Sequence, residues 1–393
     1  MLVLPVLRLK KERAEPARGG HPWLFSGAFE AIPALDPGSL CRIEDAAGGF
    51  VAVGYVNPSR SLAVRLLAWR EIDSVDALLD ARLDAAITLR AGTIPPDTDA
   101  YRLIASEGDF LPGLIVDRYA DVLVMQVQTA GMERLRDRVV EMLDARLHPR
   151  TIYERSDIPI RREEDLPMRK GVLRGAELPE EIAIHEHGRT YFVQPQSGQK
   201  TGFFLDQREH RNRVERRATG RRVLNCFAYT GGFSLAAWKG GAAAVTSIES
   251  SEPAVTLLRR NLAHAGYESE RIVHGDAFQF LREARRGQER YDLVILDPPA
   301  FAKKKHQVES AVRGYKEINL QALEVLAPGG EMFTFSCSQY IDPVLFKKVV
   351  FGAAADARAS VQLLERLGHP IDHPVSMSHP EGEYLKGLHL RRL

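Results

Sequence analysis

The sequence predicts an α/β protein: a carboxy-terminal domain with a mostly parallel, doubly wound sheet, preceded by a small β barrel and a small central α+β domain. Three observations support this prediction. The chain has 393 residues, which at roughly 150 residues per domain corresponds to two to three domains. Short β segments separated by turn residues fill the first 75 residues, and after Gln194 apolar runs alternate with helical patterns. We expect domains over 1–75, 76–190 and 191–393.

Each domain contains a recognisable series of elements. In the first, turn residues at 19–22, 36–39, 47–49 and 57–59 separate the β segments. A helical pattern covers 73–91, and 92–100 is typical of a linker. The central domain should contain a helix over 132–147 and strands at 101–105, 113–119, 122–128, 151–154, 181–185 and 190–193, with Ala120-Asp121 as a hairpin turn. The third domain has buried strand candidates at 223–227, 244–248, 271–273, 293–296 and 332–335.

Composition excludes several classes of protein. The 53 Lys and Arg against 52 Asp and Glu give a formal charge of +1, with 45% apolar residues, so the chain is neither disordered nor basic throughout. This average still allows a local basic face for nucleic acid. No apolar run approaches the ~18 residues of a membrane span, and the opening apolar stretch is too short for a secretory signal. We expect a cytoplasmic protein with no membrane contact.

The end of each predicted strand in the third domain carries residues suited to a nucleoside ligand. The first strand turns through Gly231-Gly232 into a helix, and backbone without Cβ allows a ligand to approach closely. Glu249 ends the second strand, where an acid can bind both ribose hydroxyls. Asp276 and Phe278 follow the third strand and suit an adenine amino group and ring face. The expected binding residues of this crevice are Asn225, Phe227, Tyr229, Thr230, Gly231, Glu249, Ser250, Asp276, Ala277, Phe278 and Asp297.

S-adenosylmethionine is the cofactor that we predict for this crevice. A nicotinamide enzyme should show G-x-G-x-x-G, which 229–233 lacks. The fourth strand instead ends in Asp297-Pro298-Pro299-Ala300-Phe301, a Pro-fixed turn that places a carboxylate where a flipped base could meet a methyl group. Taken singly, Asp-Pro-Pro could be an ordinary turn and Glu249 a helix cap. The ordered series of four strand ends favours the cofactor.

Cys337 is the candidate nucleophile. It follows the fifth apolar run and is flanked by Ser336 and Ser338, so it should lie at the same sheet edge as Asp297. Carbon 5 of a pyrimidine attacks a methyl group only after a thiolate has added to carbon 6, which suits a cysteine. The alternative is that Cys337 is a small buried hydrophobe. Cys41 and Cys226 are expected to be structural, and three dispersed cysteines favour neither a disulfide framework nor a metal site.

The sequence resembles the bacterial class I methyltransferases that make 5-methylcytosine in 23S ribosomal RNA and carry an amino-terminal PUA domain. The resemblance covers nearly the whole chain. It rests on the segments 20–27 (GHPWLFSG), 198–208 (GQKTGFFLDQR), 225–232 (NCFAYTGG), 297–301 (DPPAF) and 336–338 (SCS).

The resemblance implies a PUA-like β barrel, a central domain and a Rossmann-like methyltransferase domain, with 23S ribosomal RNA as partner and a homodimer as assembly. It implies that Cys337 attacks carbon 6, that Asp297 contacts the N3 and N4 edge of cytosine, and that Phe203, Asp206 and Arg208 line the cofactor and substrate entrance. Other RNA cytosine-5 enzymes use a second cysteine directly after the Pro of this motif. Here Pro299 occupies that place, so product release needs another base or water.

Two basic segments near the crevice could contact RNA. One contains Arg208, Arg211, Arg213, Arg216, Arg217, Arg221 and Arg222; the other is Lys303-Lys304-Lys305. Each is either a phosphate-binding surface or an ordinary solvated face. The basic front at 8–18 adds a third patch. We predict substrate contacts from Pro298, Pro299, Phe301, Lys303, Lys304, Lys305 and Arg211.

Two other functions fit parts of the sequence. Asp-Pro-Pro followed by an aromatic residue also serves methylation of exocyclic amino groups, although Ala300 here separates Phe301 from the motif. An RNA-binding assembly factor with a vestigial cofactor site is the third reading. Replacement of Cys337 separates the first two, and S-adenosylmethionine binding separates both from the third.

Overall fold

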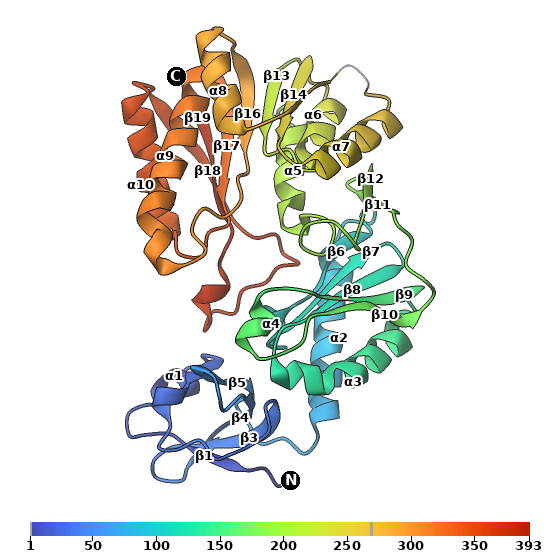
Figure 1. Ribbon diagram of the computed structural model, residues 1–393, viewed down its shortest axis with the longest axis vertical. Helices are drawn as coiled ribbons and strands as arrows, with labels where there is room; N and C mark the ends of the chain where they lie inside the picture. Colours follow the sequence, from blue (N-terminus) through green and yellow to red (C-terminus); the bar gives the residue numbers. More distant parts are fainter. Residues whose placement is uncertain (1, 268–269) are drawn as a thin grey trace. The chain divides into compact units, whose positions relative to one another are not determined.

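The computed structural model describes residues 2–267 and 270–393 and divides into two compact units (Figure 1). Unit 1 comprises Met1–Ile182, Gln194–Leu205 and Ile371–Gly382, and unit 2 comprises Ala183–Val193, Asp206–Pro370 and Glu383–Leu393. Residue 1, in the first predicted domain, and residues 268–269, in the third, lie outside the described residues. The division of the chain into three domains stays a prediction.

The first sheet of unit 1 is built from the short β segments expected in residues 1–75. Its order is β1-β3-β4-β5-β2, with β1 parallel to β3 and the other neighbours antiparallel. Apolar side chains such as Leu7, Ile43 and Val64 form its buried core. The elements are β1 (Val6–Arg8), α1 (Glu15–Arg18), β2 (Trp23–Phe25), β3 (Ser39–Glu44), β4 (Phe50–Val56) and β5 (Leu62–Ala68).

A second sheet in unit 1 has the order β10-β9-β8-β7-β6. The Ala120-Asp121 hairpin joins β7 and β8 as predicted, whereas β10 was not foreseen. Ser74 and Thr129 cap the two long helices by accepting backbone hydrogen bonds, and α2 extends to Thr93, so the predicted linker is shorter. The elements are α2 (Val75–Thr93), β6 (Ala100–Ala105), β7 (Leu114–Tyr119), β8 (Val122–Val127), α3 (Ala130–Leu147), β9 (Thr151–Ser156), α4 (Ile160–Glu163) and β10 (Arg169–Gly175).

Unit 2 contains a sheet of order β15-β14-β13-β16-β17-β19-β18, together with the β11–β12 pair. The five predicted strands are present and parallel, in the order 3-2-1-4-5. The antiparallel β19 then lies between β17 and β18. The strands are β11 (Ile182–Glu186), β12 (Arg189–Val193), β13 (Arg222–Cys226), β14 (Ala244–Glu249), β15 (Arg271–His274), β16 (Tyr291–Leu296), β17 (Leu326–Ser336), β18 (Val361–Leu367) and β19 (Lys386–Arg392).

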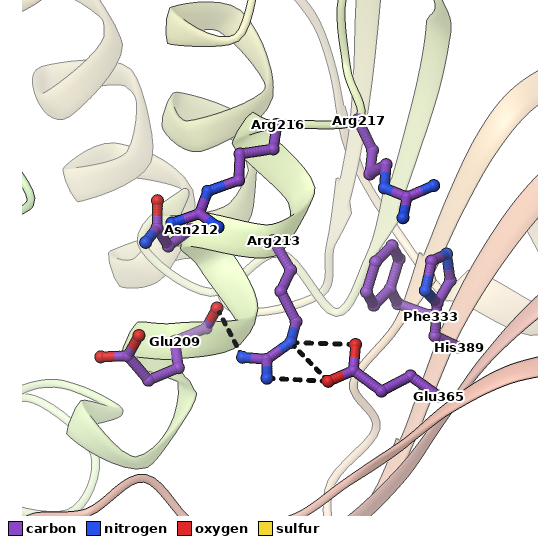
Figure 2. Close-up of a pocket in the computed structure, with 8 residues that line it drawn as sticks. All are labelled: Glu209, Asn212, Arg213, Arg216, Arg217, Phe333, Glu365 and His389. Carbon is purple, nitrogen blue, oxygen red and sulfur yellow. Dashed lines mark hydrogen bonds and ion pairs between the residues drawn. The ribbon is translucent and has the colours of Figure 1, made fainter.

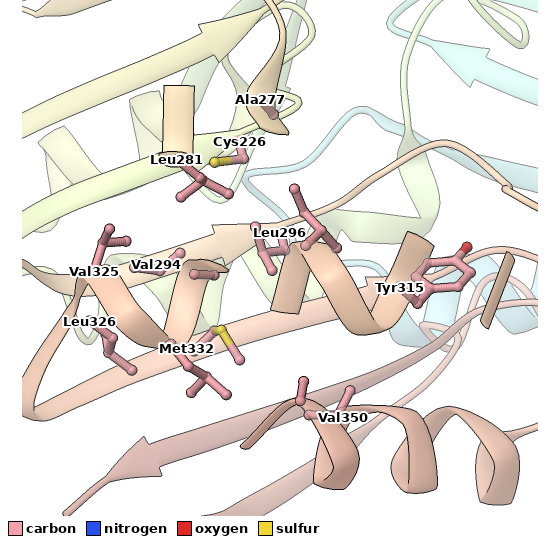
Figure 3. Close-up of a cluster of buried hydrophobic side chains, with 14 of the residues drawn as sticks. Cys226, Ala277, Leu281, Val294, Leu296, Tyr315, Val325, Leu326, Met332 and Val350 are labelled. Atoms are coloured by element: carbon pink, nitrogen blue, oxygen red, sulfur yellow. The ribbon is translucent and has the colours of Figure 1, made fainter. Parts of the chain in front are cut away.

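Helices cover both faces of this sheet, because successive strand residues point to opposite sides. Val294, Leu296 and Met332 pack against α8, α9 and α10 in the cluster drawn in Figure 3. Their neighbours Leu293 and Phe333 pack on the other face, against α5 and α6. The helices are α5 (Arg208–Glu215), α6 (Gly232–Lys239), α7 (Glu252–His264), α8 (Ala277–Arg286), α9 (Val308–Val325) and α10 (Pro343–Asp356).

The strand order predicts where a ligand binds. The order reverses between β13 and β16, and ligands of open α/β sheets bind beyond the carboxyl ends of the strands at such a reversal. In the part of the chain that the structure describes, no helix combines the length and apolar character needed to cross a bilayer. The predicted α/β class is confirmed, and we expect the ligand beyond the carboxyl ends of β13, β14, β15, β16 and β17.

Candidate active site

The loop after β13 is held in an open, strained conformation. Phe227 and Tyr229 have φ angles of 63° and 49°, and Gly231 has 85° before α6 begins. Left-handed backbone at non-glycine residues costs free energy and is retained where the surroundings fix it. Glu249 supplies part of that fixation, since its Oε2 accepts from the Tyr229 amide at 2.8 Å and its Oε1 from Ser251 at 2.8 Å.

The polar groups around this loop fit a nucleoside ligand. Thr230 is 2% exposed, and among the described residues its Oγ1 has no hydrogen-bond partner. An unsatisfied buried hydroxyl is rare unless a ligand completes it. The Glu249 carboxylate retains lone pairs beyond its two backbone bonds and suits a ribose diol. These residues would hold the sugar and the adjoining chain of S-adenosylmethionine.

An aromatic surface lies beyond β15. Asp276 is exposed and caps α8 by accepting from Gln279 at 2.8 Å, while Ala277 is buried as the first residue of that helix. Phe278 is half-buried, and its ring centroid lies 6.2 Å from that of Phe301. Ser250, exposed after β14, accepts a hydrogen bond from His274. The ends of β15 and β16 thus bring together two of the predicted aromatic contacts.

The ends of β16 and β17 bring Cys337 beside the Asp-Pro-Pro turn. Leu296 pairs with Thr334 in the parallel ladder, so Asp297 and Cys337 follow at the same edge. The Cys337 Sγ lies 4.0 Å from the Pro298 carbonyl oxygen, and the cysteine is half-buried. Pro298 is buried while Pro299 is exposed. This is the juxtaposition that the sequence predicted for a nucleophile and a base-binding turn.

The remaining cysteines are structural, as expected. Cys41 is buried and its thiol donates to the Gly54 carbonyl, and burial raises its pKa to about 12. Cys226 lies inside β13, where burial also raises the thiol pKa. Neither thiol has an ionised form at neutral pH. Cys337 is the cysteine placed at the crevice.

A hydroxyl cluster supports the Cys337 segment. The Tyr315 hydroxyl, from α9, lies 2.9 Å from the Ser338 Oγ, which also accepts from the Ala302 amide at 3.3 Å. The Tyr315 ring packs against the Phe301 ring at a tilt of 39°, with ring centroids 4.5 Å apart. The loop after the Asp-Pro-Pro turn is therefore tied to the loop that carries the cysteine. Tyr315 could not be recognised from the sequence, because a lone tyrosine in a helical pattern is typical of a core residue.

Asn225 belongs to a buried polar network beneath the cofactor loop. Its amide donates to the Ser234 Oγ at 2.9 Å, and Ser234 contacts the Ser247 Oγ at 2.5 Å. Ser247 in turn donates to Glu270, which also accepts from the Trp238 indole at 2.9 Å. Burial raises the pKa of Glu270 to about 7. This network joins β13, α6 and β14 behind the strained loop.

The 203–208 segment divides between the two units. Phe203 is buried in unit 1, where its amide donates to the Tyr119 hydroxyl at 3.1 Å. Asp206 is buried in unit 2 and accepts from the Tyr384 hydroxyl at 2.7 Å. Arg208 is buried beside Glu209, with 3.0 Å between its Nε and the carboxylate. Contact of these residues with cofactor stays a prediction.

Most arginines of the 208–222 run form ion pairs within the protein. The predicted RNA contact of Arg211 is therefore wrong. Arg211 is 2% exposed and donates to Glu186 through two nitrogens, with Arg189 on the same carboxylate. The guanidinium serves to hold α5 on β11. Moreover, α5 ends at Glu215, so Arg216 and Arg217 do not continue its helical face.

Three of the other arginines, Arg213, Arg216 and Arg217, line a cavity of about 400 Å³ together with Phe333 and His389. Figure 2 shows Arg213 bonded to Glu365 and Arg217 above Phe333 and His389. Arg217 and Arg221 pair with Glu331. These carboxylates offset the positive charge, so the solvated-face interpretation suits this run.

The three lysines lie on the surface directly after the Asp-Pro-Pro-Ala-Phe segment, as predicted. Lys303, Lys304 and Lys305 are exposed, and the loop is anchored just before them by the buried Ala302. The Lys303 and Lys304 amides both donate to the Gln307 side chain, which fixes the backbone while the ammonium groups face solvent. A cationic surface therefore adjoins the Asp-Pro-Pro turn.

Comparison with known proteins decides the family. A family profile described as S-adenosylmethionine-dependent methyltransferase matches residues 170–389, and a PUA-like domain profile matches residues 7–69. The chain belongs to the S-adenosylmethionine-dependent methyltransferases. The cofactor of this methyltransferase is accordingly S-adenosylmethionine, as the strand-end residues predicted. The expected family resemblance is confirmed.

Relatives of the methyltransferase align over nearly its full length. It is 42% identical over 387 residues to "Ribosomal RNA large subunit methyltransferase I" of Photobacterium profundum, covering 97% of both chains. It is 40% identical to the protein of the same name from Erwinia tasmaniensis, covering 98% of both. The solved structure of SMU.776, described as a methyltransferase complexed with SAH, has a TM-score of 0.85 and 25% identity, covering 99% of this chain and 100% of that one.

Proposed function

We propose that the protein transfers a methyl group from S-adenosylmethionine to carbon 5 of a cytosine in 23S ribosomal RNA, through a covalent bond between Cys337 and the base. The observation that carries this proposal is the 4.0 Å separation of the Cys337 Sγ from the Pro298 carbonyl oxygen, at the same carboxyl edge of the sheet at which β14 ends in Glu249. The names of the full-length relatives support large-subunit ribosomal RNA as the substrate.

Cys337 begins the reaction in this proposal. Its thiolate attacks carbon 6 of cytosine, a carbon–sulfur bond forms, and the electron pair of the C5–C6 double bond makes carbon 5 nucleophilic. When bound, S-adenosylmethionine supplies an electrophilic methyl group to this crevice. A base then removes the proton of carbon 5, the carbon–sulfur bond breaks, and the thiolate is regenerated.

Asp297 stabilises the charge that the addition creates. Negative charge builds on N3 as the thiolate adds, and a carboxyl group at the N3 and N4 edge can donate to or hydrogen-bond that edge. Phe301 and Pro299 would then contact the flipped base, and Lys303, Lys304 and Lys305 the adjoining phosphates.

The other parts of the chain complete this proposal. The PUA-like region supplies a second RNA contact, and the cofactor contacts of Asn225, Phe203, Asp206 and Arg208 belong to the same hypothesis. The protein works in the cytoplasm as a homodimer. A base other than cysteine, or water, removes the carbon-5 proton, because Pro299 stands where other RNA cytosine-5 enzymes have a second cysteine.

The deciding experiment is methylation of 23S RNA from cells lacking this protein, followed by mass-spectrometric mapping of the modified nucleoside. We expect wild-type protein to restore 5-methylcytosine at one position, Cys337→Ala to abolish it, and the buried-thiol control Cys41→Ala to retain it. Methylation of an exocyclic amino group that survives Cys337→Ala would establish the amino-group alternative. Absence of S-adenosylmethionine binding by calorimetry would favour the assembly factor.

A further inference from the structure

Lys386 brings an amine into the protein beside the segment of Cys337. It is the first residue of β19 and pairs in register with Ser336, the last residue of β17, so Cys337 follows immediately. Lys386 is 4% exposed. Burial of an ammonium group is costly unless polar partners compensate for the lost water. We therefore expect specific polar partners to compensate for the burial of the Lys386 ammonium group.

The partners of Lys386 are backbone carbonyls that follow the cysteine. Its Nζ donates to the carbonyl oxygen of Ser338 at 2.6 Å and to that of Ile341 at 2.7 Å. An ammonium group has three donors, and these carbonyls take two of them. The lysine thereby closes the turn between β17 and α10. The conformation of the backbone that presents Cys337 depends on it.

The charges around Lys386 couple it to the thiol. Burial lowers the pKa of Lys386 to about 8, while Cys337, Glu383 and Asp342 act in the opposite direction. Coupling between two titrating groups is reciprocal, so the ammonium lowers the pKa of the cysteine by the same interaction. Tyr315 faces the cysteine from α9, and burial raises its pKa, with Cys337 adding to the rise. At neutral pH the phenol is therefore neutral and Lys386 mostly cationic.

We propose that Lys386 is a positioning residue for Cys337, which fixes the Ser338–Ile341 turn and favours the thiolate form of the cysteine through its positive charge. The inference rests on the proposed function, because it explains how a cysteine at this edge becomes nucleophilic near neutral pH. The ionisation of the Cys337 thiol can also be measured without observing methyl transfer.

The test measures the rate of Cys337 alkylation by iodoacetamide as a function of pH, in the full chain, with the modified peptide identified by mass spectrometry. Lys386→Met removes the charge and the donors, Lys386→Gln removes the charge but keeps an N–H donor, and Lys386→Arg keeps the charge. Lys347→Met, an exposed lysine on α10, is the matched control. Folding is checked by thermal melting and by S-adenosylmethionine binding.

We expect both uncharged variants to shift the alkylation midpoint upward by about one pH unit, so that alkylation at pH 7 slows about tenfold. Lys386→Arg and Lys347→Met should stay within about threefold of wild type. Should Lys386→Met fail to fold, Lys386→Gln carries the comparison. A wild-type pH profile in a folded uncharged variant would overturn the inference. Lys386-dependent alkylation together with 5-methylcytosine formation by Cys337→Ala would support the charge coupling and overturn the proposed function.

Discussion

Glu249 links the ends of two neighbouring strands, because its carboxylate at the end of β14 accepts the backbone amide of Tyr229 after β13 at 2.8 Å. The same carboxylate is the group suited to a ribose diol. In the proposed site, this one side chain shapes the loop and would also bind the ligand. Its removal should act on both.

Replacement of Glu249 by Ala should weaken S-adenosylmethionine binding by roughly 10- to 100-fold, since hydrogen bonds to a charged group contribute about 1.5–3 kcal/mol. Isothermal titration calorimetry measures this change. Glu252→Ala, at an exposed position on α7 three residues further on, should leave affinity unchanged. Equal affinity in the wild type and Glu249→Ala would remove Glu249 from the cofactor site.

Replacement of Asp297 by Asn should slow single-turnover methylation by about 10²- to 10³-fold, the usual effect of removing a group that stabilises developing negative charge. The rate is measured with saturating S-adenosylmethionine, and the affinity for cofactor is measured in parallel so that weakened binding is separated from slower chemistry. A near-normal single-turnover rate would show that the carboxyl group does not serve the N3 edge.

The lysine loop predicts the salt dependence of RNA binding. Neutralising Lys303, Lys304 and Lys305 together should reduce the slope of log Kd against log salt by about 2–3, because each phosphate contact contributes close to one. Filter binding between low and moderate salt measures the slope. Lys347 and Lys348, exposed on α10, provide a matched double substitution that should leave it unchanged. If the triple variant keeps the wild-type slope, the lysines are a solvated face.

Glu270 predicts a pH dependence of stability. Burial raises its pKa from 4.5 to about 7, so in this interval the folded protein holds a proton that the unfolded chain has lost. Stability from this group is present below pH 4.5 and is lost as the pH rises through 7. Glu270→Gln mimics the protonated acid and should be more stable than wild type at pH 8 by on the order of 2 kcal/mol.

Thermal or urea unfolding at pH 5 and pH 8 checks the Glu270 prediction. The advantage of Glu270→Gln should nearly vanish at pH 5, where wild type is itself protonated. Glu289→Gln serves as a comparison of opposite sign: although burial raises its pKa, Tyr291 and Arg271 hold the net value below normal, so its ionised form stabilises the fold. An equal effect of Glu270→Gln at both pH values would contradict the assignment.

Four of the parallel strands of unit 2, β13, β14, β16 and β17, could be predicted because each contains a short apolar run that is mostly buried on both faces. Glu249, Asp297 and Cys337 stand at or just after the carboxyl ends of β14, β16 and β17. The strands β10, β18 and β19 could not be predicted. Val361–Leu367 is largely exposed, and Lys386–Arg392 is basic. Neither segment therefore contains the continuous apolar run that predicts a buried strand. Pairing across the sheet, and not local pattern, makes them strands.

The residues that support the site could likewise not be predicted from local sequence pattern. Lys386 acts on carbonyls that register brings beside it, and Arg211 is neutralised by Glu186, which lies 25 positions earlier in the chain. A basic run in the sequence gives no information about which carboxylates it will meet. Reactive residues at strand ends can be recognised in the sequence. Pairing between residues from distant segments can be recognised only in the folded structure.

The position of β19 has a consequence for the order of synthesis. This strand enters the sheet between β17 and β18, although both of those precede it in the chain. While the ribosome is still making residues 386–392, the backbone of β17 has an unpaired edge and β18 has no neighbour to join. The turn that follows Cys337 also lacks its hydrogen bonds from Lys386 until that residue has been added. A nascent chain therefore acquires a finished nucleophile only after β19 has been added to the sheet.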